Sequence, residues 1–173
     1  MTRWEDKRNS AKLPEGKYRS IAGYADESLV IGRALACGYN LFFKAWRDSS
    51  YDAVLDYNGK LFRIEIKGTR IEKVSTTSGG RSGQQISREA ESREHIVSKN
   101  DCEFLICING NNGDCYIIPT EVLEIFNQKS LAFTKVENFK EKWSIFSGTS
   151  TFDVKQIRDG FSHLSIEELE NIT

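Results

Sequence analysis

The feature that most constrains the fold is the dipeptide Asn58-Gly59, which separates two strand-like runs in the stretch YDAVLDYNGKLFRIEIK, residues 51–67. Asn-Gly is the dipeptide that most favours a tight two-residue hairpin turn. In such a hairpin Tyr57 faces Lys60, and counting outward from that pair places Asp52 opposite Glu65. The sequence therefore predicts an antiparallel hairpin with a defined register.

Charged side chains gather on one face of this hairpin. Because side chains alternate between the two faces of a strand, Lys67 shares a face with Glu65 and Asp52. The opposite face, expected to point to the core, carries Phe62, Ile64 and Ile66. Opposed Cβ atoms lie about 5 Å apart and like charges there repel, so the two carboxylates favour a hard divalent cation. The alternative is a cross-strand salt-bridge patch on a solvent-facing sheet.

Overall charge does not point to a nucleic-acid partner, because the chain of 173 residues has a formal net charge of −1. The distribution is more informative, since residues 60–99 hold nine Lys or Arg against five Asp or Glu. A local basic stretch of this kind is a weak electrostatic signature of nucleic-acid binding.

The four cysteines do not favour a zinc site, because none form a C-x-x-C pair and only two histidines are present. We expect buried thiols in a reducing compartment. The polar start MTRWEDKRNS does not resemble a signal peptide, and no apolar run approaches the ~20 residues that span a membrane. We therefore expect a cytoplasmic protein without a membrane partner.

The pattern along the chain alternates helices and strands within one domain. We expect a helix over Ile21–Cys37 ended by Gly38, a strand over Tyr39–Trp46, the hairpin, and a mobile polar loop over Gly68–Gly83. A helix from Ser87 to about Ser98, strands at Cys102–Ile108 and Cys115–Ile118, and a helix over Glu121–Phe126 capped by Thr120 follow. Residues 127–160 read as irregular with two short strands, and Ser165 opens a last helix.

The first helix places a carboxylate on an apolar stripe. Glu27, Ile31, Ala34 and Leu35 follow helical spacing and share one side of the predicted helix. A buried carboxylate needs a partner, although a Glu at the edge of the stripe can also reach water.

The order of elements, with Asp52 followed thirteen residues later by Glu65-Ile66-Lys67, resembles the PD-(D/E)-x-K nuclease superfamily. Restriction endonucleases and Holliday-junction resolvases share its core. The first motif here is Tyr51-Asp52 instead of Pro-Asp, a departure that many members show. The resemblance implies an α/β, restriction-endonuclease-like core with a central mixed β-sheet flanked by helices.

The resemblance also implies hydrolysis of DNA phosphodiesters with Mg²⁺, for which Mn²⁺ would substitute. Asp52, Glu65 and the backbone carbonyl of Ile66 would hold the metal, and Lys67 would orient the attacking water and stabilise developing negative charge. Glu27 matches the helix carboxylate that some members use as an additional metal-site acid.

The residues after this motif are candidates for DNA contact through charged, amide and hydroxyl groups. They are Arg70, Lys73, Ser78, Arg81, Gln84, Gln85 and Arg88. A flexible surface loop without a DNA role is the alternative.

The sequence thus predicts a sequence-specific double-strand DNA endonuclease of the type II restriction kind. One metal site cuts one strand, so we expect a homodimer or higher symmetric oligomer. We expect an N-terminal arm (1–20), a nuclease core (21–128) and an extension for dimerisation or DNA contact (129–173). A Holliday-junction resolvase, an intron homing endonuclease and a non-cleaving DNA-binding module are the alternatives.

Overall fold

The computed structural model describes residues 18–44, 49–79 and 94–147. Its α-helices are α1 (Tyr18–Ala36) and α2 (Thr120–Phe126). Its strands are β1 (Asn40–Phe43), β2 (Ala53–Tyr57), β3 (Lys60–Thr69), β4 (Lys73–Ser75), β5 (Thr77–Ser78), β6 (His95–Ile96), β7 (Phe104–Asn109), β8 (Cys115–Pro119) and β9 (Ser130–Ala132). Two 3₁₀ helices follow, η3 (Phe133–Phe139) and η4 (Trp143–Ser147). The described residues up to Trp143 form one compact unit, and residues 144–147 belong to a second.

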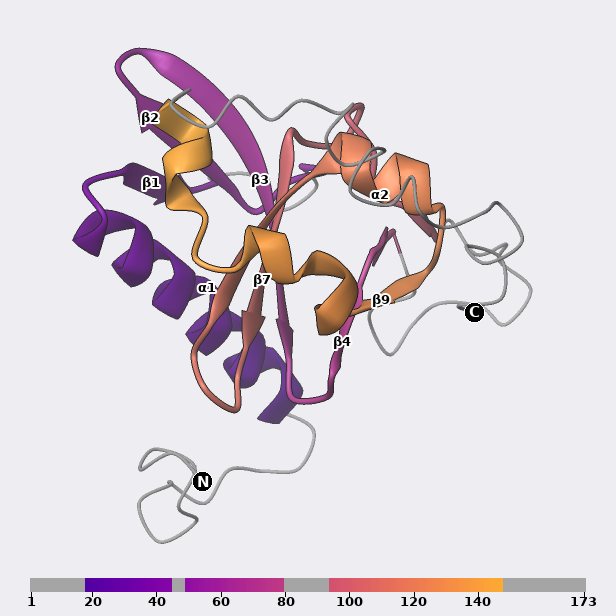
Figure 1. The fold of residues 1–173 in the computed structure, drawn as a ribbon. Helices are drawn as coiled ribbons and strands as arrows, with labels where there is room; N and C mark the ends of the chain where they lie inside the picture. Colours follow the sequence, from indigo (N-terminus) through magenta and orange to yellow (C-terminus); the bar gives the residue numbers. More distant parts are fainter. Residues whose placement is uncertain (1–17, 45–48, 80–93, 148–173) are drawn as a thin grey trace, which may run out of the picture. The chain divides into compact units, whose positions relative to one another are not determined.

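Five strands form the central sheet, in the order β1-β2-β3-β7-β8. Neighbouring strands are antiparallel except β3 and β7, which are parallel, so the sheet is mixed. Helix α1 packs against β1, β3 and β7, while α2 packs against β8. Figure 1 shows the two helices on opposite sides of β3 and β7. The predicted α/β fold with a mixed sheet flanked by helices is confirmed.

The hairpin of β2 and β3 has the predicted turn and register. Asn58 and Gly59 both adopt positive φ angles, 53° and 79°, as a type I′ turn requires. The ladder runs from Tyr57 opposite Lys60 to Ala53 opposite Ile64. The predicted core side chains Phe62, Ile64 and Ile66 are all buried.

Helix α1 ends as predicted, but its buried stripe is displaced by one residue. Gly38 has a φ of 84°, and the Tyr39 N–H donates to the Ala34 carbonyl at 2.9 Å, which closes the helix end. The buried positions are Asp26, Val30 and Ala34, whereas Leu35 is 55% exposed. Of the predicted stripe only Ala34 is buried, whereas Glu27 and Ile31 are partly exposed.

Two segments between β3 and β7 differ from the prediction. Part of the expected loop over 68–83 is strand: β3 runs to Thr69, β4 pairs with β9, and β5 pairs with β6. The helix expected up to Ser98 is wrong at its end, where His95–Ile96 form β6. The tertiary pairing of β5 with β6 and the burial of Val74 and Val97 outweigh the polar composition there. The start of that helix and the expected last helix lie outside the described residues, as does most of the N-terminal arm.

Thr120 does not cap α2, although the helix itself was predicted. Pro119 occupies the cap position, and the Thr120 hydroxyl donates to the carbonyls of Cys102 and Glu103 at 3.0 and 3.2 Å. Thr120 therefore ties α2 to the start of β7 and is fully buried.

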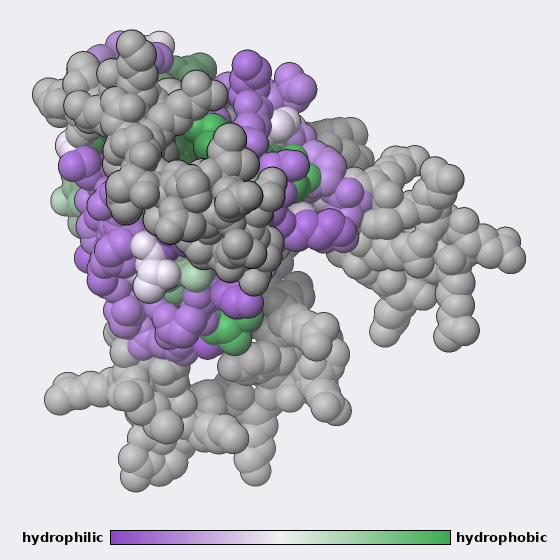
Figure 2. Space-filling model, turned by 45° about the vertical axis from the view of Figure 1, so that its right-hand side comes forward, coloured by the Kyte–Doolittle hydropathy of each residue, from purple (hydrophilic) through white to green (hydrophobic). Residues whose placement is uncertain are grey.

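The described surface in Figure 2 is largely hydrophilic, with hydrophobic side chains in small separate areas. Cys102, Cys107 and Cys115 are buried as predicted, and burial raises the pKa of each thiol to about 12, whereas Cys37 is exposed. Within residues 18–44, 49–79 and 94–147, no helix is both long and apolar enough to cross a membrane.

Candidate active site

Four elements bring charged side chains together at one end of the β2–β3 hairpin. Asp52 lies immediately before β2, and Glu65 and Lys67 lie two residues apart on β3. Lys44 follows β1, and Glu27 lies on α1. The charges of Asp52, Lys44 and Lys67 act on the Glu27 carboxyl, and those of Lys67 and Asp52 act on the Glu65 carboxyl. We call these five residues the charge cluster.

The Asp52 carboxylate is held between β1 and β3. Its Oδ1 accepts a hydrogen bond from Lys44 Nζ at 3.1 Å, and its Oδ2 accepts one from the Ile66 N–H at 3.0 Å. The Asp52 N–H donates to the Ile64 carbonyl at 2.8 Å. The carboxylate therefore lies beside the Glu65-Ile66-Lys67 motif, as the hairpin register predicts.

Glu65 is a buried carboxylate with a nearby cation. It is only 5% exposed, and Lys67 Nζ donates to its Oε1. The Ser78 hydroxyl, from β5, lies 3.4 Å from the same oxygen. The side chain of Lys67 remains 27% exposed, so its ammonium lies between a buried carboxylate and the surface.

Two carboxyl groups of the site, Glu65 and Glu27, have a raised pKa. Burial raises the pKa of Glu65, Lys67 lowers it, and the Asp52 charge raises it again, with a net increase. Burial and the Asp52 charge also raise the pKa of Glu27 against the opposing effect of Lys44 and Lys67. The two lysines therefore offset the mutual repulsion of the carboxylates only in part.

Lys44 belongs to the site but was absent from the predicted set. Strand β1 pairs with β2 from Asn40 opposite Asp56 to Phe43 opposite Ala53. Continuing that register by one residue places Lys44 opposite Asp52, so a count across the first strand would have found it.

The donor set fits a hard divalent cation. Asp52 and Glu65 offer carboxylate oxygens in a partly buried place where added positive charge would relieve the raised pKa of Glu65. Among the described residues no group of three or more His, Cys, Asp or Glu side chains is arranged as a ready ligand set. Asp52 is paired with Lys44 and Glu65 with Lys67 instead. Metal ligation by Asp52, Glu65 and the Ile66 carbonyl stays a prediction.

The residues predicted to contact DNA occupy different places. Lys73 is exposed on β4, and Ser78 lies against Glu65. Arg70 holds the carboxylate of Asp26. The remaining four lie outside the described residues and are Arg81, Gln84, Gln85 and Arg88.

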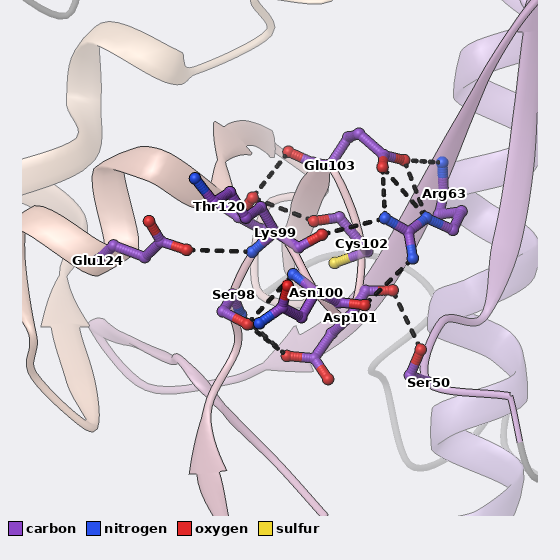
Figure 3. A network of polar contacts seen from close by, with 10 residues as sticks. All are labelled: Ser50, Arg63, Ser98, Lys99, Asn100, Asp101, Cys102, Glu103, Thr120 and Glu124. Atoms are coloured by element: carbon purple, nitrogen blue, oxygen red, sulfur yellow. Dashed lines mark hydrogen bonds and ion pairs between the residues drawn. The ribbon is translucent and has the colours of Figure 1, made fainter.

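A polar network supports the segment that leads into Asp52 (Figure 3). Arg63 binds Glu103 through its backbone N–H, at 2.7 Å, and through its guanidinium. The same guanidinium donates to two backbone carbonyls of the turn over residues 98–103, at 3.0 and 3.1 Å. Ser50 Oγ donates to the Asp101 carbonyl of that turn at 3.1 Å. The network therefore links β3, the turn before β7 and the approach to the site.

Comparison with known proteins assigns the family. A sequence profile of the PD-(D/E)XK endonuclease family matches residues 20–147. The chain belongs to the PD-(D/E)XK endonuclease family. As a PD-(D/E)XK endonuclease it is a nuclease with the restriction-endonuclease-like fold, which confirms the predicted fold and enzyme class. PD-(D/E)XK nucleases generally use divalent metal ions and act on DNA.

The fold is also that of a solved homing endonuclease. The structure of the bacterial homing endonuclease I-Ssp6803I matches with a TM-score of 0.63 and 18% sequence identity, over 79% of this chain and 99% of that chain. A search of curated proteins finds no significant match. The family match extends past the predicted core boundary at residue 128, and β9 pairs with β4. The division into arm, core and extension stays a prediction.

Proposed function

We propose that this PD-(D/E)XK endonuclease is a Mg²⁺-dependent, sequence-specific enzyme of the type II restriction kind that cuts both strands of DNA. The observation that carries the proposal is the meeting of Asp52 with the Glu65-Ile66-Lys67 motif across the β2–β3 hairpin. The predicted motif therefore comes from two segments, the residue before β2 and the middle of β3.

Asp52, Glu65 and the Ile66 carbonyl are the proposed ligands of Mg²⁺, with Mn²⁺ as a substitute. A bound divalent ion supplies Lewis acidity toward the scissile phosphate. The Ile66 N–H holds Asp52 Oδ2, which sets the direction of that carboxylate before any ligand binds. Burial keeps Glu65 in a single place beside it.

Lys67 and Glu27 are the two further proposed catalytic residues. The Lys67 ammonium is partly exposed and can donate a hydrogen bond to the attacking water and offset charge that develops on the phosphate. Glu27 is the proposed additional acid of the metal site, because the charges of Asp52 and Lys67 act on its carboxyl group.

Recognition of DNA is assigned to the residues that follow β3. The proposed contacts are Lys73 on β4, Ser78 on β5 and the polar residues Arg81, Gln84, Gln85 and Arg88. One site cuts one strand, so cleavage of both strands requires two chains related by symmetry, and we propose a homodimer or higher symmetric oligomer.

The test is cleavage of plasmid or phage DNA with Mg²⁺ or Mn²⁺, an EDTA control, and mapping of the ends. We expect discrete fragments that disappear in EDTA and in Lys67→Ala. Lys44→Ala is the comparison, because Lys44 also lies in the charge cluster, where it donates to Asp52. Comparing its cleavage rate with that of Lys67→Ala distinguishes the effect of the motif lysine from that of its neighbour. DNA left intact with every metal would refute the proposal and favour a non-cleaving DNA-binding module.

A homing endonuclease is the second candidate, because the matched structure bears that description. The two differ in the length of the DNA site and not in the chemistry of the cut. Cutting at many short sites supports the restriction reading, and cutting at one long site supports the homing reading. Preferential cutting of a four-way junction would instead identify a resolvase.

A further inference from the structure

A half-buried ion pair lies directly beside the site. Asp26, on α1, is 3% exposed and accepts two hydrogen bonds from Arg70, which follows β3. Arg70 Nη1 lies 2.6 Å from Asp26 Oδ2, and Nη2 lies 2.8 Å from Oδ1. A bidentate pair of this kind fixes the orientation of both groups.

Two glycines make room for this pair. A Cβ atom at Gly68 would overlap the Asp26 carboxylate, and one at Gly110 would lie 2.7 Å from Arg70 Cζ. The backbone around Arg70 is also tied down, because the Gly110 N–H donates to the Thr69 carbonyl at 2.7 Å and Asn111 Nδ2 donates to the Arg70 carbonyl at 3.0 Å. The pair therefore occupies a place that the backbone of β3 and of the turn after β7 leaves open for it.

The pair adjoins two members of the charge cluster along the chain. Asp26 precedes Glu27, and Gly68 follows Lys67. Successive side chains on a helix point about 100° apart, so a fixed direction for Asp26 also fixes the direction of Glu27. Because Asp26 fits against Gly68 of β3 and Arg70 holds its carboxylate, this contact restrains the rotation of α1 about its axis.

We propose that Asp26 and Arg70 act together as a positioning pair that sets the place of Glu27 relative to Asp52 and Lys67. Arg70 is then a positioning residue and not the DNA contact that its place after the motif suggests. This inference rests on the proposed function, because it concerns the rate at which the site cuts DNA.

The two roles of Arg70 predict different measurements. An arginine that contacts phosphate strengthens binding, and its removal lowers the salt dependence of the binding constant by about one unit. Removal of a positioning arginine, whose guanidinium is held by Asp26, should leave DNA affinity and its salt dependence unchanged. Its removal should instead lower the cleavage rate at saturating enzyme.

The experiment compares the full chain with Arg70→Gln, Asp26→Asn and the double variant. Affinity for DNA is measured in EDTA by fluorescence anisotropy over a range of salt, and single-turnover cleavage is measured with Mg²⁺. We expect each single variant to cut at least tenfold more slowly, with affinity within twofold and the same salt slope. The double variant should be no slower than the slower single variant, since both changes remove one interaction.

Arg33→Gln is the matched control, because Arg33 is about as exposed as Arg70 and also pairs with a carboxylate, that of Glu141 at 3.5 Å. Arg33 lies on α1, as Asp26 does. It should cut at the wild-type rate. If Arg70→Gln does not fold, the double variant, which leaves no unpaired buried charge, carries the same expectation.

A readout through Glu27 separates positioning from general support of the fold. In a Glu27→Gln background, Arg70→Gln should lower the cleavage rate no further. A further tenfold loss there, or a weaker affinity with a lower salt slope for Arg70→Gln alone, would overturn the inference while leaving the proposed function intact. A wild-type chain that cuts no DNA with any metal would overturn both.

Discussion

Gly68→Ala tests whether the space beside Asp26 is required for stability. A new Cβ at this position would overlap the Asp26 carboxylate, which cannot move aside because Arg70 holds both of its oxygens. An alanine in an extended strand is otherwise no worse than glycine and is favoured by about 0.5–1 kcal/mol. A loss of stability in Gly68→Ala therefore indicates the clash, whereas a gain indicates that there is none.

The expected cost follows from displacing one partner of the pair. Breaking a buried ion pair costs about 3–5 kcal/mol, and the 43% exposure of the Arg70 side chain places this case at the lower end, about 3 kcal/mol. The gain of about 0.5–1 kcal/mol from alanine reduces this to a net cost of about 2 kcal/mol. In a chain of this size each kcal/mol shifts the melting temperature by about 2–4 °C, so we expect a fall of roughly 4–8 °C. Urea denaturation and thermal melting followed by circular dichroism measure both quantities.

Gly32→Ala is the matched control on α1. No atom lies within 4 Å of the Cβ that this change adds, so the helix should gain about 0.5–1 kcal/mol from the better helix former. Repeating Gly68→Ala in an Asp26→Ala background should remove most of its cost. Two results for Gly68→Ala would refute the reasoning. One is a melting temperature within about 1 °C of wild type, and the other is an equal loss of stability in the wild-type and Asp26→Ala backgrounds.

Three further predictions concern the charges. Asp52→Ala should abolish cutting and leave DNA affinity in EDTA at least as high as in wild type, because removal of a negative charge cannot weaken attraction to phosphate. A folded variant that binds DNA more weakly than wild type would contradict the prediction. Lys44→Met should lower the melting temperature of the metal-free protein, because Asp52 loses the ammonium 3.1 Å away. Mg²⁺ should narrow the difference in melting temperature between this variant and wild type. A difference that widens when Mg²⁺ is added argues against ligation by Asp52. For Glu103, burial opposes ionisation, but the hydrogen bonds and charge of Arg63 outweigh it and hold the pKa below its ordinary 4.5. Because the folded-state pKa is lowered, wild type should be more stable than Glu103→Gln above pH 4.5, the ordinary pKa of the group. This advantage should be lost as the pH falls through the folded-state pKa. Urea midpoints of both proteins over roughly pH 3 to 7 measure it.

Local signals in the sequence were enough to place the hairpin and its motif. Asn58 and Gly59 carry the turn geometry in their own conformational preferences, so the register of β2 and β3 followed without knowledge of any distant contact. Gly38 marked the end of α1 for the same reason. The family resemblance then added the expected chemistry of Asp52, Glu65 and Lys67.

What the sequence left out depends on distant partners. Asp26 reads as a solvated charge on a helix until Arg70, 44 residues later, is known to lie beside it. Strands β5 and β6 consist of two residues each and exist through their mutual pairing, which no local pattern records. Lys44 was within reach of sequence reasoning and needed only the register of β1 with β2.

The parallel pairing of β3 with β7 has a consequence for the order of folding. The β2–β3 hairpin can close early, because its strands are joined by two residues, whereas β7 must return from about 40 residues away to pair with β3 at Glu65 opposite Leu105. Burial of Glu65 depends on that later step, because β3 lies between β2 and β7 in the sheet. We therefore expect a newly made chain to gain a complete cutting site only late in folding, after its motif residues have already met.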